Sequence, residues 1–332
     1  MSLLETIRDY PVPNRQITTT RLEESLERVR AGMEDRARRV SGRVGSALAE
    51  HISRPGKMLR ARFAVQLGAA LGVGGAKAET VGRAMELAHN ASLLHDDCVD
   101  DAALRRGRPT PNKAYGSSVA LLLGDIAFTQ ALEEALDLGP KAVERLVSAA
   151  REMAIGELQE EFLRGSVEVT LASYMGIAAR KTGALFEWGA LALSDASPLE
   201  HESCDPAKLG AALGILLQMV DDIHDYTLPD SVTGKEAAQD AKAGRVTLPG
   251  VFALADPSAR ERFLELWASR GSAPGASGRL ARFLKECGAI EAGRGECRKV
   301  VANILALSRR LPVPGAVTPF AEFVSAMAAR EF

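Results

Sequence analysis

The chain has few cysteines and no disulfide framework. Its four cysteines, Cys98, Cys204, Cys287 and Cys297, show no CxxC spacing among 332 residues. Proteins that depend on disulfides in oxidising compartments carry dense, paired cysteines instead. The sequence therefore favours a reducing compartment, and we expect a cytoplasmic protein.

Long apolar runs are also missing. The longest candidate extends only from Leu209 to Val220 and runs directly into Asp221, whereas a membrane-spanning helix needs about 20 apolar residues. The first ten residues, MSLLETIRDY, carry acidic side chains where a signal peptide would place its apolar core. We expect no stable membrane insertion.

The charge balance excludes further classes of partner. The net charge is only −2, so the chain as a whole gives no electrostatic signal for nucleic acid or for an anionic membrane surface. Hydrophobic residues make up 46% of the chain and charged residues 25%, which excludes disordered and fibrous proteins. We expect a globular protein without a nucleic-acid partner.

Strand signals are nearly absent. Ala, Leu, Glu and Arg at helical spacing fill most windows, and this pattern predicts an all-α fold. Thr20 and Glu23 form a capping-box pattern that would open one helix running to about residue 50. Further helices are predicted over residues 57–71, 78–100, 117–138, 141–164, 170–194, 206–226, 258–270, 278–287, 290–310 and 318–331.

No long linker and no repeat of fixed period divides the chain. We therefore expect one domain over residues 1–332, a single helical bundle with an extended segment over residues 1–20 and a surface loop over residues 271–277. Residues 227–244 contain Gly234 and Lys235 and are interpreted as a lid over the site.

An acidic segment closes the helix predicted over residues 78–100. The run HDDCVDD places four carboxylates within residues 95–101. On a helix, Asp96 and Asp100 lie one turn apart on one side and Asp97 lies about 100° away, so the three can converge on a cation. Charges this close would raise each other's pKa unless a cation neutralises them. The segment predicts a site for a hard divalent ion.

The same pattern returns at the end of a second apolar helix, in Asp221, Asp222 and Asp225. A single DDxxD sequence is as compatible with a solvated helix end as with a metal site, but two copies favour the metal site. Magnesium prefers oxygen ligands and is usually held by carboxylates together with substrate phosphates. Two facing motifs therefore predict two or three Mg²⁺ ions around a diphosphate.

Basic residues accompany the acidic motifs. Lys57 and Arg60 follow a Pro-Gly turn, and Arg105 and Arg106 follow the first motif. Arginine matches phosphate oxygens in geometry and stays charged. Met85, His89, Ser92, Asp96 and Asp100 share one helix face by their spacing, and they predict that metal, histidine and a hydrophobic floor line one cavity.

Five segments together resemble the trans-polyprenyl diphosphate synthase family. They are GKMLR (56–60), LLHDDCVDDAALRRGRPTPN (93–112), KTGAL (181–185), QMVDDIHD (218–225) and GKEAAQDAKAGRVTLP (234–249). The resemblance covers about residues 50 to 255, in the family's order. It implies an isoprenoid synthase type of fold, a helical bundle around a central cavity, and a homodimer.

The resemblance also implies roles for individual residues. Magnesium and the allylic diphosphate would be held by Asp96, Asp97, Asp100, Asp221, Asp222 and Asp225. Isopentenyl diphosphate would bind Lys57, Arg60, His89 and Arg106. The allylic diphosphate would also contact Arg105, Lys181, Thr182, Gln218, Lys235 and Arg245, the last at a position where the family usually has lysine.

The implied activity is a magnesium-dependent prenyl transfer that joins an allylic diphosphate to isopentenyl diphosphate. Small residues upstream of the first motif, Ala88, Ala91 and Ser92, point to a trans-polyprenyl product of C20 or longer, with Met85, or else Leu121 and Leu122, as the cavity floor. The alternatives are a terpene cyclase, an HD-type metal phosphohydrolase using His95 and His224, and a noncatalytic partner subunit.

Overall fold

The computed structural model describes residues 19–53, 56–105, 107–227, 238–270 and 275–329. The helices are α1 (Thr19–Arg39), α2 (Gly42–Ile52), α3 (Leu59–Ala70), α4 (Gly75–Val99), α5 (Pro111–Tyr115), α6 (Ser117–Leu136), α7 (Pro140–Phe162), α8 (Leu171–Ala178), α9 (Ala184–Ala196), α10 (Pro206–Thr227), α12 (Gln239–Lys242), α13 (Leu248–Ala255), α14 (Pro257–Ala268), α15 (Ala276–Glu286), α16 (Ala289–Ser308) and α17 (Pro314–Ala329). A π-helical turn, η1 (Ala179–Gly183), separates α8 from α9.

The all-α prediction is confirmed. Within the described ranges, the sheet consists of two strands of two residues each, β1 (Leu104–Arg105) and β2 (Arg108–Pro109), paired antiparallel. Most of the predicted helices agree with the structure to within a few residues. Among the described residues, no helix combines the length and the apolar character that crossing a membrane requires.

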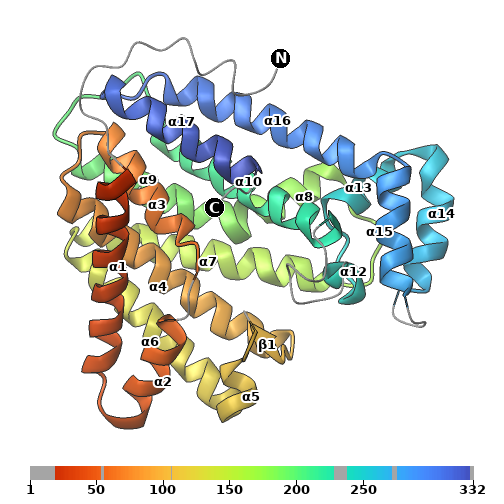
Figure 1. The fold of residues 1–332 in the computed structure, drawn as a ribbon, viewed down its shortest axis with the longest axis horizontal. Helices are drawn as coiled ribbons and strands as arrows, with labels where there is room; N and C mark the ends of the chain where they lie inside the picture. Colours follow the sequence, from red (N-terminus) through yellow and green to blue (C-terminus); the bar gives the residue numbers. More distant parts are fainter. Residues whose placement is uncertain (1–18, 54–55, 106, 228–237, 271–274, 330–332) are drawn as a thin grey trace.

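The two helices that carry the aspartate motifs lie inside the bundle. α4 packs against α3, α6 and α9, and α10 packs against α9, η1 and α16 (Figure 1). α3 and α9, which both pack against α4, carry buried aromatic side chains: the Phe63 and Phe186 rings meet edge to face at 5.1 Å, and Trp188 of α9 is fully buried. α9 packs against both motif-bearing helices and so fixes them relative to each other.

Two predicted helices are wrong in detail. The helix expected from Thr20 to about residue 50 is divided into α1 and α2, because Gly42 takes a left-handed backbone conformation with φ of +66°. The helix expected over residues 170–194 is interrupted by η1. α5, α12, α13 and the short β1–β2 hairpin were not predicted from the sequence.

Some predictions fall outside the described residues. The extended segment over residues 1–20 lies almost entirely there, as do most of the predicted lid and part of the loop over residues 271–277. Arg106 and Lys235 lie there as well, so their predicted contacts remain predictions.

Candidate active site

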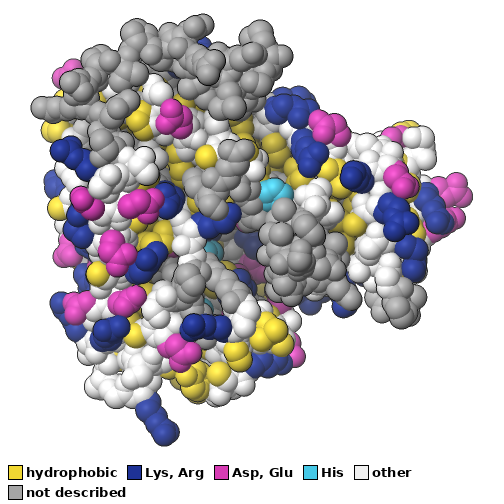
Figure 2. Space-filling model, in the orientation of Figure 1, with side chains coloured by type: hydrophobic (Ala, Val, Ile, Leu, Met, Phe, Trp, Pro, Cys, Tyr) yellow, Lys and Arg dark blue, Asp and Glu magenta, His cyan; other side chains and the backbone are white. Residues whose placement is uncertain are grey.

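A cavity of about 1020 Å³ opens between the helices of the bundle. In the space-filling view the surface is hollowed near the centre of the molecule, where acidic, basic and histidine side chains gather (Figure 2). The structure brings many of the predicted site residues into its lining: Lys57, Arg60, His89, Asp96, Arg105, Lys181, Thr182, Gln218 and Asp221. These residues come from segments far apart in the sequence.

The three aspartate side chains of the first motif have different surroundings. Asp96 faces the cavity, and burial together with the nearby Glu157 raises the pKa of its carboxyl to about 7. Asp97 is fully buried and lies outside the cavity lining, where Arg105 contacts its Oδ1 at 2.8 Å through Nη2. Asn112 donates to the backbone carbonyl of Asp97 at 2.9 Å, which anchors the last turn of α4.

Asp100, at the end of α4, takes part in a network of charges. Its Oδ1 lies 2.6 Å from Nη2 of Arg245 and 3.3 Å from Nη2 of Arg164. Arg245 also contacts Glu160 and Glu161. Burial alone would lower the pKa of Arg245, but the surrounding carboxylates outweigh it and raise that pKa.

In the second motif, too, one aspartate lines the cavity and the next is buried. Asp221 lines the cavity beside Gln218, whereas Asp222 is 2% exposed and accepts hydrogen bonds from Tyr174 Oη at 2.6 Å, from Gln218 Nε2 at 2.8 Å and from the Leu248 amide at 3.3 Å. Burial raises the pKa of Asp222 to about 7, although the Tyr174 and Gln218 hydrogen bonds lower it.

Asp225, in the last turn of α10, contacts the start of α12. Its Oδ1 accepts from the Gln239 amide at 3.1 Å and its Oδ2 from the Asp240 amide at 3.0 Å. A carboxylate that receives the first amides of a short helix stabilises that end of the helix. This contact links the second motif to the segment that leads to Arg245.

The π-helical turn presents two of the predicted side chains. Thr182 donates from Oγ1 to Gln218 at 2.8 Å, and Lys181 reaches two carboxylates on α7. Close packing of the backbones permits this, because a Cβ at Gly156 would lie 2.7 Å from the Lys181 amide and one at Gly214 would lie 2.7 Å from Gly183 Cα. π-Turns of this kind are frequent at functional sites.

Sequence reasoning missed the acidic face of α7. Glu157 and Glu160 lie 2.7 and 2.6 Å from Lys181 Nζ, and Glu161 contacts Arg245. The two carboxylates outweigh the effect of burial and raise the pKa of Lys181. The i, i+3, i+4 spacing of these glutamates was a visible signal, since it places them on one helix face.

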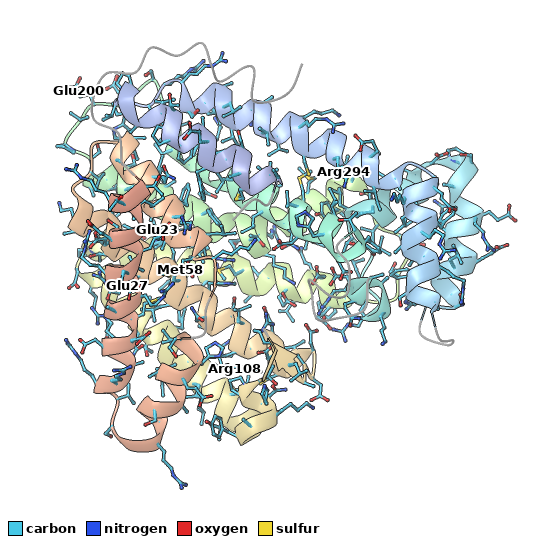
Figure 3. All side chains as sticks on the ribbon, viewed as in Figure 1. Glu23, Glu27, Met58, Arg108, Glu200 and Arg294 are labelled. Atoms are coloured by element: carbon cyan, nitrogen blue, oxygen red, sulfur yellow. The ribbon has the colours of Figure 1, made fainter. Side chains whose placement is uncertain are left out.

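A second basic group lies at the start of α3. Lys57 and Arg60 line the cavity with His89 of α4, and the Arg60 guanidinium lies 5.7 Å from the centre of the Phe186 ring. Met58, between the two cations, lies beside α1, where Arg30 contacts its sulfur at 3.5 Å (Figure 3). The cavity therefore has cations at the start of α3 as well as around Lys181.

The predicted cavity floor is wrong. Met85 is fully buried but is not part of the lining; its Sδ would lie 2.4 Å from a Cβ at Gly189, so it fills the gap beside α9. Leu121 and Leu122 are 43% and 62% exposed and do not line the cavity either. Its apolar wall instead includes Ala88, Ala91, Met33, Ile52, Phe128 and Met153.

The donor chemistry of the site fits magnesium. Among the described residues, no three His, Cys, Asp or Glu side chains already surround one point where a metal ion would sit. Asp96 and Asp221 nevertheless line the same cavity, and Oδ2 of Asp97 is buried without a hydrogen-bond partner. Carboxylate oxygens of this kind are the ligands that Mg²⁺ prefers.

Comparisons with known proteins agree with this geometry. The family of polyprenyl synthetases matches residues 43–282. The chain is 29% identical to the octaprenyl diphosphate synthase of Escherichia coli over 266 residues, which are 79% of this chain and 82% of the relative. It is 34% identical to component 2 of the heptaprenyl diphosphate synthase of Geobacillus stearothermophilus, covering 71% and 74% of the two chains.

A solved structure shares the fold over nearly the whole chain. The polyprenyl synthase of Caulobacter crescentus, in complex with calcium and isoprenyl diphosphate, superposes with a TM-score of 0.86 at 25% identity and covers 96% of this chain and 100% of the other. The fold and the site define an isoprenoid-synthase type of enzyme. The chain belongs to the polyprenyl synthetase family and is a trans-prenyltransferase, as the sequence predicts.

Proposed function

We propose that the enzyme condenses an allylic diphosphate with isopentenyl diphosphate and releases a trans-polyprenyl diphosphate of C20 or longer. The observation that carries this proposal is the single cavity lined at once by Asp96 and Asp221, one from each aspartate motif, and by the cations Lys57, Arg60 and Lys181. Two diphosphates need two groups of cations, and the cavity has both.

We assign the acidic residues to magnesium and the basic residues to the substrates. Asp96, Asp97, Asp100, Asp221, Asp222 and Asp225 would hold two or three Mg²⁺ ions, which supply Lewis-acid assistance to the departing diphosphate. Lys57, Arg60, His89 and Arg106 would bind isopentenyl diphosphate. Arg105, Lys181, Thr182, Gln218, Lys235 and Arg245 would contact the allylic diphosphate.

The protein contributes orientation and charge. Loss of the allylic diphosphate leaves a carbocation, the isopentenyl double bond attacks it, and loss of a proton, which the released diphosphate can accept, gives a chain longer by one isoprene unit. Cations fixed around the diphosphates stabilise the developing negative charge. The apolar cavity wall excludes water that would quench the cation.

Small residues in the cavity wall support the proposed product length. Ala88 and Ala91 leave room below Asp96, and the cavity continues to Met33 and Ile52. The relatives are synthases of octaprenyl, heptaprenyl and geranylgeranyl diphosphates, all C20 or longer, which supports the same range for this chain.

We also propose a homodimer of one-domain subunits located in the cytoplasm, without a nucleic-acid partner. Large apolar side chains are exposed along α6 and α7, among them Val119, Leu122, Val147 and Phe162. Exposed apolar residues that gather on neighbouring helices are typical of an interface between proteins. One cluster of buried residues includes side chains from α1 through α17, which supports a single domain.

The test is to incubate the protein with Mg²⁺, isopentenyl diphosphate and C5, C10, C15 or C20 allylic primers in turn. Elongated diphosphates support the proposal, and a cyclised hydrocarbon from the primer alone would favour a terpene cyclase. Release of phosphate without elongation would favour a phosphohydrolase. His95 offers that alternative little support, because its Nε2 lies 3.2 Å from the Leu121 carbonyl and 3.4 Å from Asp125.

A further inference from the structure

The start of α3 has no cap of its own. Met58, which precedes the helix, takes a left-handed conformation with φ of 48° and ψ of 46°, and its side chain makes no capping hydrogen bond. The first amides of a helix have no partner within the helix and need an acceptor from elsewhere. This helix end matters because Lys57 lies just before it and Arg60 lies in its first turn.

The acceptor is Glu86, from the middle of α4. Its Oε1 receives hydrogen bonds from the backbone amides of Arg60 and Ala61, both at 3.1 Å. Glu86 is 6% exposed and belongs to the cavity lining. A carboxylate at this end of a helix also interacts favourably with the positive end of the helix dipole.

Glu86 connects two parts of the site. It lies one turn before His89 on the helix that carries Asp96, and it bonds the amide of Arg60 itself. We propose that Glu86 is a positioning residue, which fixes the Lys57–Arg60 segment relative to α4 and so builds the isopentenyl diphosphate site. The assignment rests on the proposed function of that site.

A second buried glutamate on the same helix provides a matched control. Glu79 is 7% exposed and is paired with Arg28 of α1 at 2.8 Å. It is absent from the cavity lining. Replacing Glu79 removes a buried carboxylate of the same type from α4 without touching the start of α3.

The experiment compares Glu86→Ala, Glu86→Gln and Glu79→Ala with the wild type. Each substrate is varied while the other is saturating, and thermal unfolding is recorded in parallel. In Glu86→Ala the KM for isopentenyl diphosphate is expected to rise about tenfold, as for a lost helix cap, with kcat and the KM for the allylic substrate much less affected. Glu86→Gln keeps an acceptor oxygen and should recover most of the loss.

Four results would count against the assignment. An unchanged KM for isopentenyl diphosphate in Glu86→Ala, or an equal rise for both substrates, would overturn the assignment while the proposed function stands. The same selective rise in Glu79→Ala would also overturn it, because general loosening of α4 would then explain the effect. Absence of condensation by the wild type would contradict the proposed function itself, and this assignment with it.

Discussion

Tyr174 donates a hydrogen bond of 2.6 Å from its hydroxyl to Oδ2 of Asp222, and so joins α8 to the second aspartate motif. Gln218 occupies the other carboxylate oxygen at 2.8 Å. Both groups of the pair are buried. A buried carboxylate needs such donors because its desolvation is costly.

Replacing Tyr174 with phenylalanine should therefore destabilise the protein. The substitution leaves Oδ2 of Asp222 with only the more distant amide of Leu248, and we expect the free energy of unfolding to fall by about 1–3 kcal/mol. Denaturant unfolding at neutral pH measures the change. Tyr115→Phe is the control, since Tyr115 is 47% exposed and should change stability by less than about 0.5 kcal/mol. Equal effects of the two substitutions would contradict this account.

Stability in the absence of metal should depend on the protonation of Asp222. Burial raises its pKa from the usual 3.8 to about 7. The protonated carboxyl therefore favours the folded state, and the contribution of Asp222 to the free energy of unfolding is most favourable at low pH and is lost as the pH rises through 7. Between pH 5 and pH 8, Asp222→Asn should gain about 3 kcal/mol in unfolding free energy relative to wild type. The measurement is unfolding of both proteins at several pH values in chelator. A difference that does not vary with pH would show that Asp222 titrates normally.

The close approach of α7 to the π-turn should not tolerate a side chain at Gly156. A Cβ there would lie 2.7 Å from the Lys181 amide nitrogen, which is backbone and cannot turn aside. Gly156→Ala should lower stability by about 1–3 kcal/mol and reduce kcat at least about tenfold, because Lys181 is displaced. Gly278→Ala in α15 is the control, since its Cβ would meet no atom within 4 Å. Wild-type kcat in Gly156→Ala would contradict the role given to this packing.

The cavity wall should set the product length. Ala91→Phe places a ring in the cavity below Asp96 and should shorten the main product by at least one isoprene unit, whereas Phe128→Ala should lengthen it. Mass spectrometry of the extracted diphosphates gives the distribution. Leu122→Ala, outside the cavity, should leave the length unchanged. Products that do not shift in either cavity variant would place the determinant elsewhere.

The all-α fold was predictable from the sequence because helices depend on local patterns, and part of the cavity lining was predictable as well. Helical periodicity sets the helices, and two DDxxD repeats single out the helix ends at Asp96 and Asp221. The Pro-Gly turn drew attention to Lys57 and Arg60, the family resemblance supplied Lys181, and the structure gathers these residues into one lining. The role of each residue toward metal and substrate remains a prediction.

The details that were missed depend on packing between helices. Spacing alone allowed Asp96, Asp97 and Asp100 to converge, but Asp97 is directed to Arg105 and Asp100 to Arg245. Periodicity also gives no warning of the π-turn, which arises where two glycines allow backbones to touch. Met85 lies on the same face of α4 as Asp96 by its spacing. Its side chain nevertheless packs in the core, because Gly189 has no side chain and leaves room for it.

The identity of the product tests the proposed prenyl transfer most directly. Purified protein is incubated with Mg²⁺, isopentenyl diphosphate and each allylic primer, and the products are identified by mass spectrometry, with chelator as the control. The expected result is metal-dependent elongation to diphosphates of C20 or longer. A folded protein that binds Mg²⁺ and elongates none of the primers would contradict it.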